Sequence, residues 1–136
     1  MKLWELQERR KHVSQMTKKE QDTIWKRLKG VQEHQWKLRS HAIIRVFEKE
    51  IHVSVKDIVS TIKNSTIIEY KTKYNKGRME ERVVLRSNAI ANEEYNLNVV
   101  FSLTTKEIVS VWLNHTNDLH STLDWNIYDK DLVLRA

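Results

Sequence analysis

The sequence predicts an α+β fold in which N-terminal helices pack on a four- to five-stranded antiparallel sheet. Up to about residue 63, apolar residues recur at spacings of three and four between charged side chains, which is typical of amphipathic helices. After Asn64 the chain turns to segments rich in β-branched and aromatic residues with partial alternation, which indicates strands. The segments are joined briefly, and strands joined in this way pair antiparallel.

Composition narrows the classes of function. The chain has 136 residues, of which 40% are hydrophobic, enough for one core. It has no cysteine, which excludes disulfides, thiolate metal sites and a cysteine nucleophile. With two glycines and no proline, it has no Walker loop or dinucleotide-binding glycine motif, and we expect no cofactor. No run of 18 apolar residues occurs, so we expect a cytoplasmic protein without a membrane partner.

The positive charge is concentrated in the first half of the chain. Residues 1–63 hold 15 Lys/Arg against 8 Asp/Glu, net +7, whereas residues 64–136 hold 9 against 10, net −1. Clustered cations favour an anionic partner, and nucleic acid is the first expectation because binding releases its condensed counterions. The alternative is a set of solvated helix faces.

Residues 2–39 are expected to be helical. Val13 and Met16 fall in a first short helix, and Thr17 with Glu20 forms a capping-box pattern that begins a second. The second helix carries an apolar stripe, interrupted by Gly30, of Ile24, Trp25, Leu28, Val31, Gln35 and Leu38. A boundary near residue 39 would divide the chain into a helical N-terminal arm, 1–39, and an α+β domain, 40–136.

Two further helices are expected before the sheet. Ser40 is a candidate cap for a helix over 41–50, whose core-facing residues would be Ile43, Ile44 and Phe47. Ser54 is a candidate cap for 55–63, with Val55, Ile58, Val59 and Ile62 on one side.

Four strands are predicted over 66–74, 81–87, 95–103 and 107–114. Residues 75–77 form the first turn, 88–94 a looser connection, and 104–106 a tight one. The tail, 124–134, is expected to add a fifth strand or to cover a sheet edge.

A cluster of titratable side chains follows the last predicted strand. Asn114, His115, Asp118 and His120 fall within seven positions, where functional loops are commonly carried by a rigid sheet. The order His-x-x-Asp-x-His-x-x-x-Asp, which ends at Asp124, matches no standard zinc spacing, so we expect no metal and prefer proton transfer at His120, oriented by Asp118 or Asp124. Ordinary turn chemistry is the alternative.

Other candidates lie on the third helix and the sheet. His41 and Arg45 are four residues apart and share a helix face, as a proton-transfer and phosphate-binding pair or as structural residues. Arg82 and Arg86 share one face of a strand and could hold phosphate, or could pair with glutamates. Trp112 could stack a base, although an aromatic residue on a strand is more often in the core.

These segments resemble a known group of proteins. SHAIIRVFEKEIHVSVKDIVSTI, RVVLRSN, NLNVVFSL and EIVSVWLN are similar to a family of small uncharacterised domains in the barnase/EndoU/colicin/RelE superfamily, which includes RelE-like and BrnT-like toxins. The similarity covers about residues 40–128, and Ser110 stands where threonine is usual. It implies a RelE-like sheet and metal-independent RNA cleavage.

Two hypotheses follow for function. The first is an RNA-binding or RNA-cleaving protein, a toxin-like endoribonuclease. Its catalytic candidates are His120, His115, His41 and Arg86, and its substrate-binding candidates are Arg45, Arg82, Asn114, Asp118 and Trp112. The second is a non-enzymatic phage or mobile-element regulator that binds a host protein through residues 1–39, an arm that is also a candidate homodimer contact. Sequence-specific DNA binding is less favoured because no helix-turn-helix pattern is seen.

Overall fold

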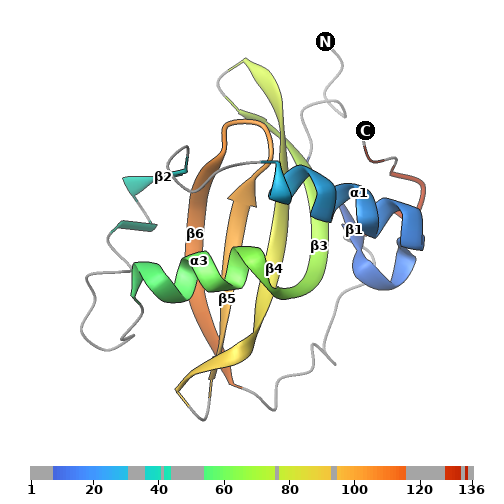
Figure 1. Ribbon diagram of the computed structural model, residues 1–136. Coiled ribbons are helices and arrows are strands. Elements are labelled where there is room, and N and C mark those ends of the chain that lie inside the picture. The colour runs from blue at the N-terminus through green and yellow to red at the C-terminus, as the bar shows by residue number, and fades with distance from the viewer. Residues whose placement is uncertain are drawn as a thin grey trace.

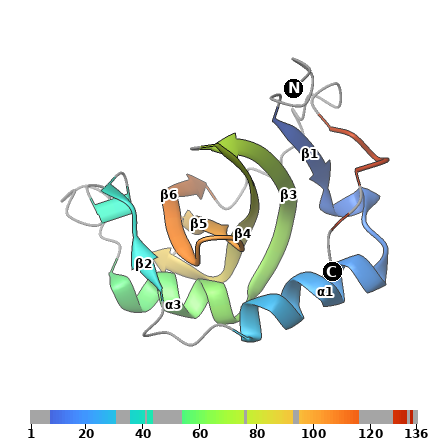
Figure 2. The same ribbon diagram turned by 90° about the horizontal axis from the view of Figure 1, so that it is seen from above.

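A six-stranded, mostly antiparallel sheet forms the centre of the protein, and two helices lie against one side of it (Figures 1 and 2). The computed structural model describes residues 8–30, 36–40, 42–43, 54–75, 77–92, 95–115, 128–132 and 134. The strand order is β1-β3-β4-β5-β6-β2. The predicted α+β class is therefore confirmed, although the sheet is larger than expected.

The central meander confirms the four predicted strands. It consists of β3 (Ser65–Asn75), β4 (Arg78–Asn92), β5 (Tyr95–Ser102) and β6 (Glu107–His115), each antiparallel to the next. The expected loose connection over 88–94 is wrong, because β4 continues to Asn92 with two register shifts against β5. Such irregularities let a strand continue where strict alternation fails.

The two outer strands come from the first 39 residues, where only helix was expected. β1 (Arg9–His12) pairs antiparallel with β3, and β2 (Lys37–Leu38) pairs parallel with β6. The predicted first helix is wrong in its described part: after β1 comes the 3₁₀ turn η2 (Val13–Gln15). Pairing with an open sheet edge outweighs local helix propensity here. The division at residue 39 stays a prediction, but both sides of it contribute to one sheet.

Helix α1 (Lys18–Lys29) begins as predicted. Thr17 accepts a hydrogen bond from the Glu20 backbone N–H, and the Glu20 carboxylate accepts one from the Thr17 N–H. The helix ends at Gly30. Of the predicted apolar stripe, Ile24 and Leu28 are buried, whereas Leu38 belongs to β2.

Helix α3 (Val55–Lys63) is capped by Ser54 and crosses β4 and β5 (Figure 1). Its Ile58 and Ile62 are fully buried, and such burial is worth about 1.5–3 kcal/mol for each side chain. Val55 is exposed, so the predicted apolar side begins one turn later. Ser40, Ala42 and Ile43 are helical, but Ala42 is buried and Ile43 exposed, which reverses the expectation for Ile43. Ile44 and Phe47 lie outside the described residues.

The tail contacts the β1 edge. Tyr128 forms an isolated parallel bridge with Arg10, and the Asp129 N–H donates to the Arg10 carbonyl. The Lys11 ammonium binds Glu20 of α1 and the Leu132 carbonyl at 3.1 Å. The described part of the tail, 128–132 and 134, contacts the β1 edge through this bridge and these hydrogen bonds, while residues 124–127 and 133 of the predicted segment lie outside the described residues.

The two faces of the sheet differ in chemistry. The face toward α1 and α3 carries the core residues, which include Ile67, Tyr70, Val83, Leu85, Leu97, Val99, Phe101 and Val111. The opposite face, which we call the polar face, has the buried Val84 and Val100 at its centre and otherwise carries mainly polar residues: Arg10, His12, Glu69, Lys71, Arg82, Arg86, Asn98, Ser102, Trp112 and Asn114. Within the described residues, no helix is long and apolar enough to cross a membrane.

Candidate functional site

The polar face brings together four of the residues singled out in the sequence. Residues that face each other across an antiparallel pair lie on the same side of the sheet. Arg86 of β4 faces Asn98 of β5, which faces Trp112 of β6. Asn114 lies two positions beyond Trp112 and faces Asn96. Arg82 lies four positions before Arg86 on the same side of β4.

Asn98 is the centre of this row and was missed in the sequence. Its side chain is completely buried, and neither amide atom has a hydrogen-bond partner within the described structure. Leaving a buried polar group unpaired costs about 1–3 kcal/mol. The signal that could have found it is the pair Asn96 and Asn98, which places an amide at alternate positions of an otherwise apolar strand.

Arg86 is held in position by its neighbour. Its Nη2 donates to the Asn96 Oδ1 at 3.2 Å, and the Asn96 amide nitrogen donates to the Ser87 carbonyl at 2.8 Å. Arg86 and Trp112 are each partly exposed. An arginine and a tryptophan, each with part of its surface exposed, therefore lie on either side of the buried Asn98.

Arg82 is placed differently from Arg86, although both were predicted to hold phosphate. Its Nε donates to the buried carboxylate of Glu80, which also binds Arg39 and accepts a hydrogen bond from Ser102 at 3.1 Å. Burial opposes ionisation of Glu80, but the hydrogen bonds from Arg39 and Arg82 outweigh it and lower its pKa. Arg82 thus belongs to an ion-pair network that joins β2, β4 and β5.

A second group of titratable side chains lies where β1, β3 and the tail meet. Glu69 is 8% exposed, and its Oε1 is 3.6 Å from Arg10 Nη1. Its Oε2 is buried without a hydrogen-bond donor among the described residues. Burial raises the pKa of Glu69, and the charges of Arg10 and Lys71 offset only part of the rise.

His12 and Tyr128 complete this group. His12 faces Glu69 across the β1–β3 pair, and its ring meets Tyr128 edge to face, with centroids 5.3 Å apart. The His12 Nδ1 lies 2.8 Å from the Ser14 hydroxyl. Burial and the Glu69 charge raise the pKa of the Tyr128 hydroxyl. Sequence patterns did not reveal the group because its members come from β1, β3 and the tail and meet only through long-range pairing.

The two parts of the polar face adjoin. Glu69 faces Val84, and Arg82 and Arg86 are the residues two positions before and after Val84 on the same side. Diagonal neighbours of this kind are about 7–8 Å apart, within reach of arginine side chains. The carboxylate of Glu69 is therefore flanked by the positions of both predicted arginines.

The other predicted site residues are not placed here. His41, Arg45, Asp118 and His120 lie outside the described residues. His115 ends β6, and its side chain is likewise not described. Among the described residues, no group of three or more His, Cys, Asp or Glu is arranged to hold a metal ion.

Comparisons with known proteins identify no family for this chain. Neither the family models, nor the curated proteins, nor the solved structures contain a match to this chain. The residues of the polar face are therefore the basis on which a function is proposed.

Proposed function

We propose that this protein binds single-stranded RNA on the polar face of its sheet and cleaves it without a metal ion. The observation that carries the proposal is the environment of Glu69: a buried carboxylate with a raised pKa and one unpartnered oxygen, beside Arg10, diagonal in the sheet register to Arg82 and Arg86, and facing His12. A cytoplasmic location and the resemblance to RelE-like domains belong to the same proposal.

Each group has a role that metal-free cleavage requires. The 2′-hydroxyl must lose a proton, the departing 5′-oxygen must gain one, and the phosphate must be held in place. A carboxylate whose pKa is raised toward neutrality is an effective proton acceptor, which we assign to Glu69. Arg86 would bind the phosphate with its planar fork. Trp112 and Asn114 would contact an unstacked base.

The proton donor is assigned to a histidine. His12 is the described candidate because it faces Glu69, and its Nδ1 accepts the Ser14 backbone N–H at 3.1 Å, which leaves Nε2 to carry the proton. His120, His115 and His41 remain the candidates predicted from the sequence. Cleavage of RNA by His12→Ala and His120→Ala, measured separately, decides between them, because loss of the donor lowers the rate by about 100-fold or more.

The binding half of the proposal is tested by Arg86→Met. We expect binding of a single-stranded RNA oligonucleotide to weaken by about tenfold, the scale of a charge-assisted hydrogen bond. Arg78→Met is the matched control, since Arg78 is an exposed arginine at the far end of the same strand. Equal affinity of the Arg86→Met variant and the natural protein would contradict binding at this face.

The alternative function, capture of a host protein by an apolar helical arm, has less support in the described contacts. Ile24 and Leu28, from the stripe that motivated it, are 1% and 4% exposed because they belong to this protein's own core. Those two side chains are unavailable to a partner in the folded protein. We therefore place RNA binding first.

A further inference from the structure

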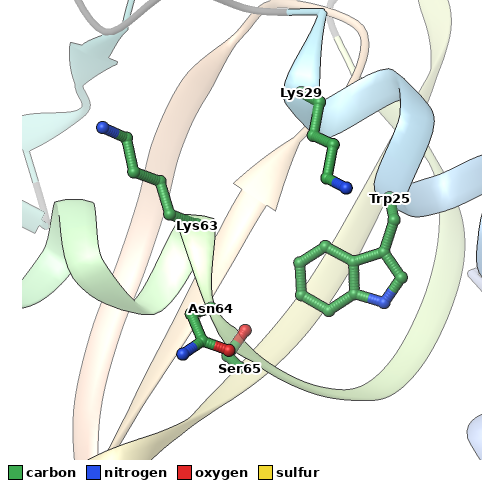
Figure 3. A pocket seen from close by; sticks show the side chains of 5 residues that line it. All are labelled: Trp25, Lys29, Lys63, Asn64 and Ser65. Carbon is green, nitrogen blue, oxygen red and sulfur yellow. The ribbon is translucent and has the colours of Figure 1, made fainter.

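A pocket on the helical side of the molecule has no role in the proposed site. It lies where the C-terminal ends of α1 and α3 approach the start of β3, and has a volume of about 330 Å³ (Figure 3). Its lining consists of Trp25, Lys29, Lys63, Asn64 and Ser65. This volume is at the lower end of the range for small-molecule sites, about 300–1,000 Å³.

The lining combines an aromatic wall with cations. Trp25 is partly buried and packs against the core, so its ring is held in place. Lys29 lies one turn later on the same helix, and in Figure 3 its ammonium points down toward the indole. Lys63, an exposed residue at the end of α3, lines the opposite side, and in Figure 3 its ammonium points away from Trp25.

Asn64 and Ser65 lie at the base of the pocket (Figure 3). The Ser65 hydroxyl oxygen is buried and has no hydrogen-bond partner among the described residues, and a ligand in the pocket does not reach it because it has almost no exposed surface. The exposed Asn64 supplies an amide that a ligand can reach. The pocket therefore offers a stacking surface, the positive charge of Lys29 and a neutral hydrogen-bonding group within a single small volume.

We propose that this pocket binds one nucleotide, with the base stacked on Trp25, the phosphate beside Lys29, and a polar group of the ligand bound by the Asn64 amide. Aromatic stacking accepts any base, and a lysine ammonium binds phosphate as a point charge. The nucleotide is either free in solution or one unit of an RNA strand. The second case rests on the proposed function, because the strand would then extend from the polar face.

The experiment uses the full-length protein and calorimetric titration with four probes: adenosine monophosphate, adenosine, inorganic phosphate, and a 2′-O-methyl adenylate hexamer that lacks the 2′-hydroxyl needed for cleavage. We expect adenosine monophosphate to bind more tightly than either adenosine or phosphate. Phosphate that binds as tightly as adenosine monophosphate would overturn the assignment, since the pocket would then be an anion site without base stacking.

Variants test the individual contacts. Trp25→Ala is expected to weaken binding of adenosine monophosphate by about tenfold or more, and Trp25→Phe to retain most of it, because stacking needs only an aromatic face. The phenylalanine variant also keeps the result interpretable if the alanine variant does not fold. Equal binding by Trp25→Ala and the natural protein would refute the proposal.

Lysine and serine variants provide matched controls. Lys29→Met should weaken binding severalfold, whereas Lys26→Met should not, since Lys26 is exposed on the same helix but does not line the pocket. Ser65→Ala is a second control: it removes an unpaired buried hydroxyl that the ligand does not reach, so it should leave binding unchanged and the melting temperature unchanged or higher. If Lys29→Met and Lys26→Met weaken binding equally, the ligand responds to the overall positive charge of the helix, and the proposed site is wrong.

The hexamer distinguishes the two sources of the nucleotide. If Trp25→Ala weakens hexamer binding as well, the pocket holds a unit of the strand; if it weakens only binding of the mononucleotide, the ligand is free. Failure of the proposed RNA site is a separate result, recognised by Arg86→Met having no effect on the hexamer. The pocket assignment survives that failure as long as adenosine monophosphate binding depends on Trp25.

Discussion

At the scale of single residues, the ionisation of the Glu69 carboxyl links the stability of the fold to the proposed chemistry. Its carboxylate is buried beside Arg10, Lys71 and Glu8, with Tyr128 nearby and His12 across the strand pair. The pKa of Glu69 is raised in the folded protein, so the fold favours its protonated form. Stability from this group is therefore greatest below the ordinary glutamate pKa and is lost as the pH rises through the folded value.

Glu69→Gln tests this link. The variant should lose the part of the pH dependence that comes from Glu69, so its melting temperature relative to the natural protein should be higher at pH 7 than at pH 4. Thermal unfolding monitored by circular dichroism at the two pH values measures this. If the difference in melting temperature between the variant and the natural protein is the same at both pH values, the pKa of Glu69 is not raised in the folded protein.

At the scale of elements, local sequence signals determine some helices and strands, and pairing between distant segments determines others. The helix caps at Thr17 and Ser54 were predictable because capping is a short-range interaction between residues three apart. The four meander strands were predictable from composition and alternation. β1 was not, because Arg9–His12 is a strand only through its pairing with β3, more than fifty residues away.

The turn between β5 and β6 contains a strained residue. Lys106 has a φ of 61°, in the left-handed region that favours glycine. Lys106→Gly should raise the free energy of unfolding by up to about 1 kcal/mol, as measured by urea denaturation. Lys106→Ala is the control: it removes the same side chain but keeps the strain, so it should give no such gain. Similar gains in both variants would exclude backbone strain as the cause.

The same division between local and long-range signals applies to the candidate site. Arg86, Trp112 and Asn114 could be selected from the sequence because their residue types suit RNA and they fall on predicted strands. Glu69, His12 and Asn98 could not, because a carboxylate or amide inside a strand gains meaning only when its burial and cross-strand neighbours are known. Burial at Asn98 and the unpaired oxygen of Glu69 are products of the tertiary fold.

At the scale of the whole molecule, a buried ion-pair network connects the outer strand β2 to the central strands. Arg39, which follows β2, binds Glu80 of β4 and Glu107 of β6, and Glu80 also binds Arg82. Glu80 is 1% exposed, so its negative charge balances the charges of Arg39 and Arg82 where water does not. This network lies on the polar face, and it holds the guanidinium of Arg82 against Glu80, whereas Arg86 donates to Asn96 and is partly exposed.

Removing the central charge should therefore destabilise the fold strongly. Glu80→Gln leaves Arg82 buried without its counter-charge, at an expected cost of about 3–5 kcal/mol in the free energy of unfolding. Glu107→Gln removes the other carboxylate bound to Arg39, but that side chain is 28% exposed, so its loss should cost about 1 kcal/mol or less. Equal costs in urea denaturation would contradict the role of Glu80.

The pH dependence of this network has the opposite sign to that of Glu69. The lowered pKa of Glu80 means that its contribution is present above the ordinary glutamate pKa and is lost as the pH falls through the folded value. The natural protein should lose more stability on acidification than Glu80→Gln does.

The most direct test of the central claim is cleavage of single-stranded RNA by the purified protein in the presence of EDTA, compared with Glu69→Gln. We predict cleavage by the natural protein and a loss of about 100-fold or more in the variant, with binding retained. Glu81→Gln is the control, because that carboxylate binds Arg27 on the helical side. No cleavage by the natural protein, or equal cleavage by Glu69→Gln, would contradict the account.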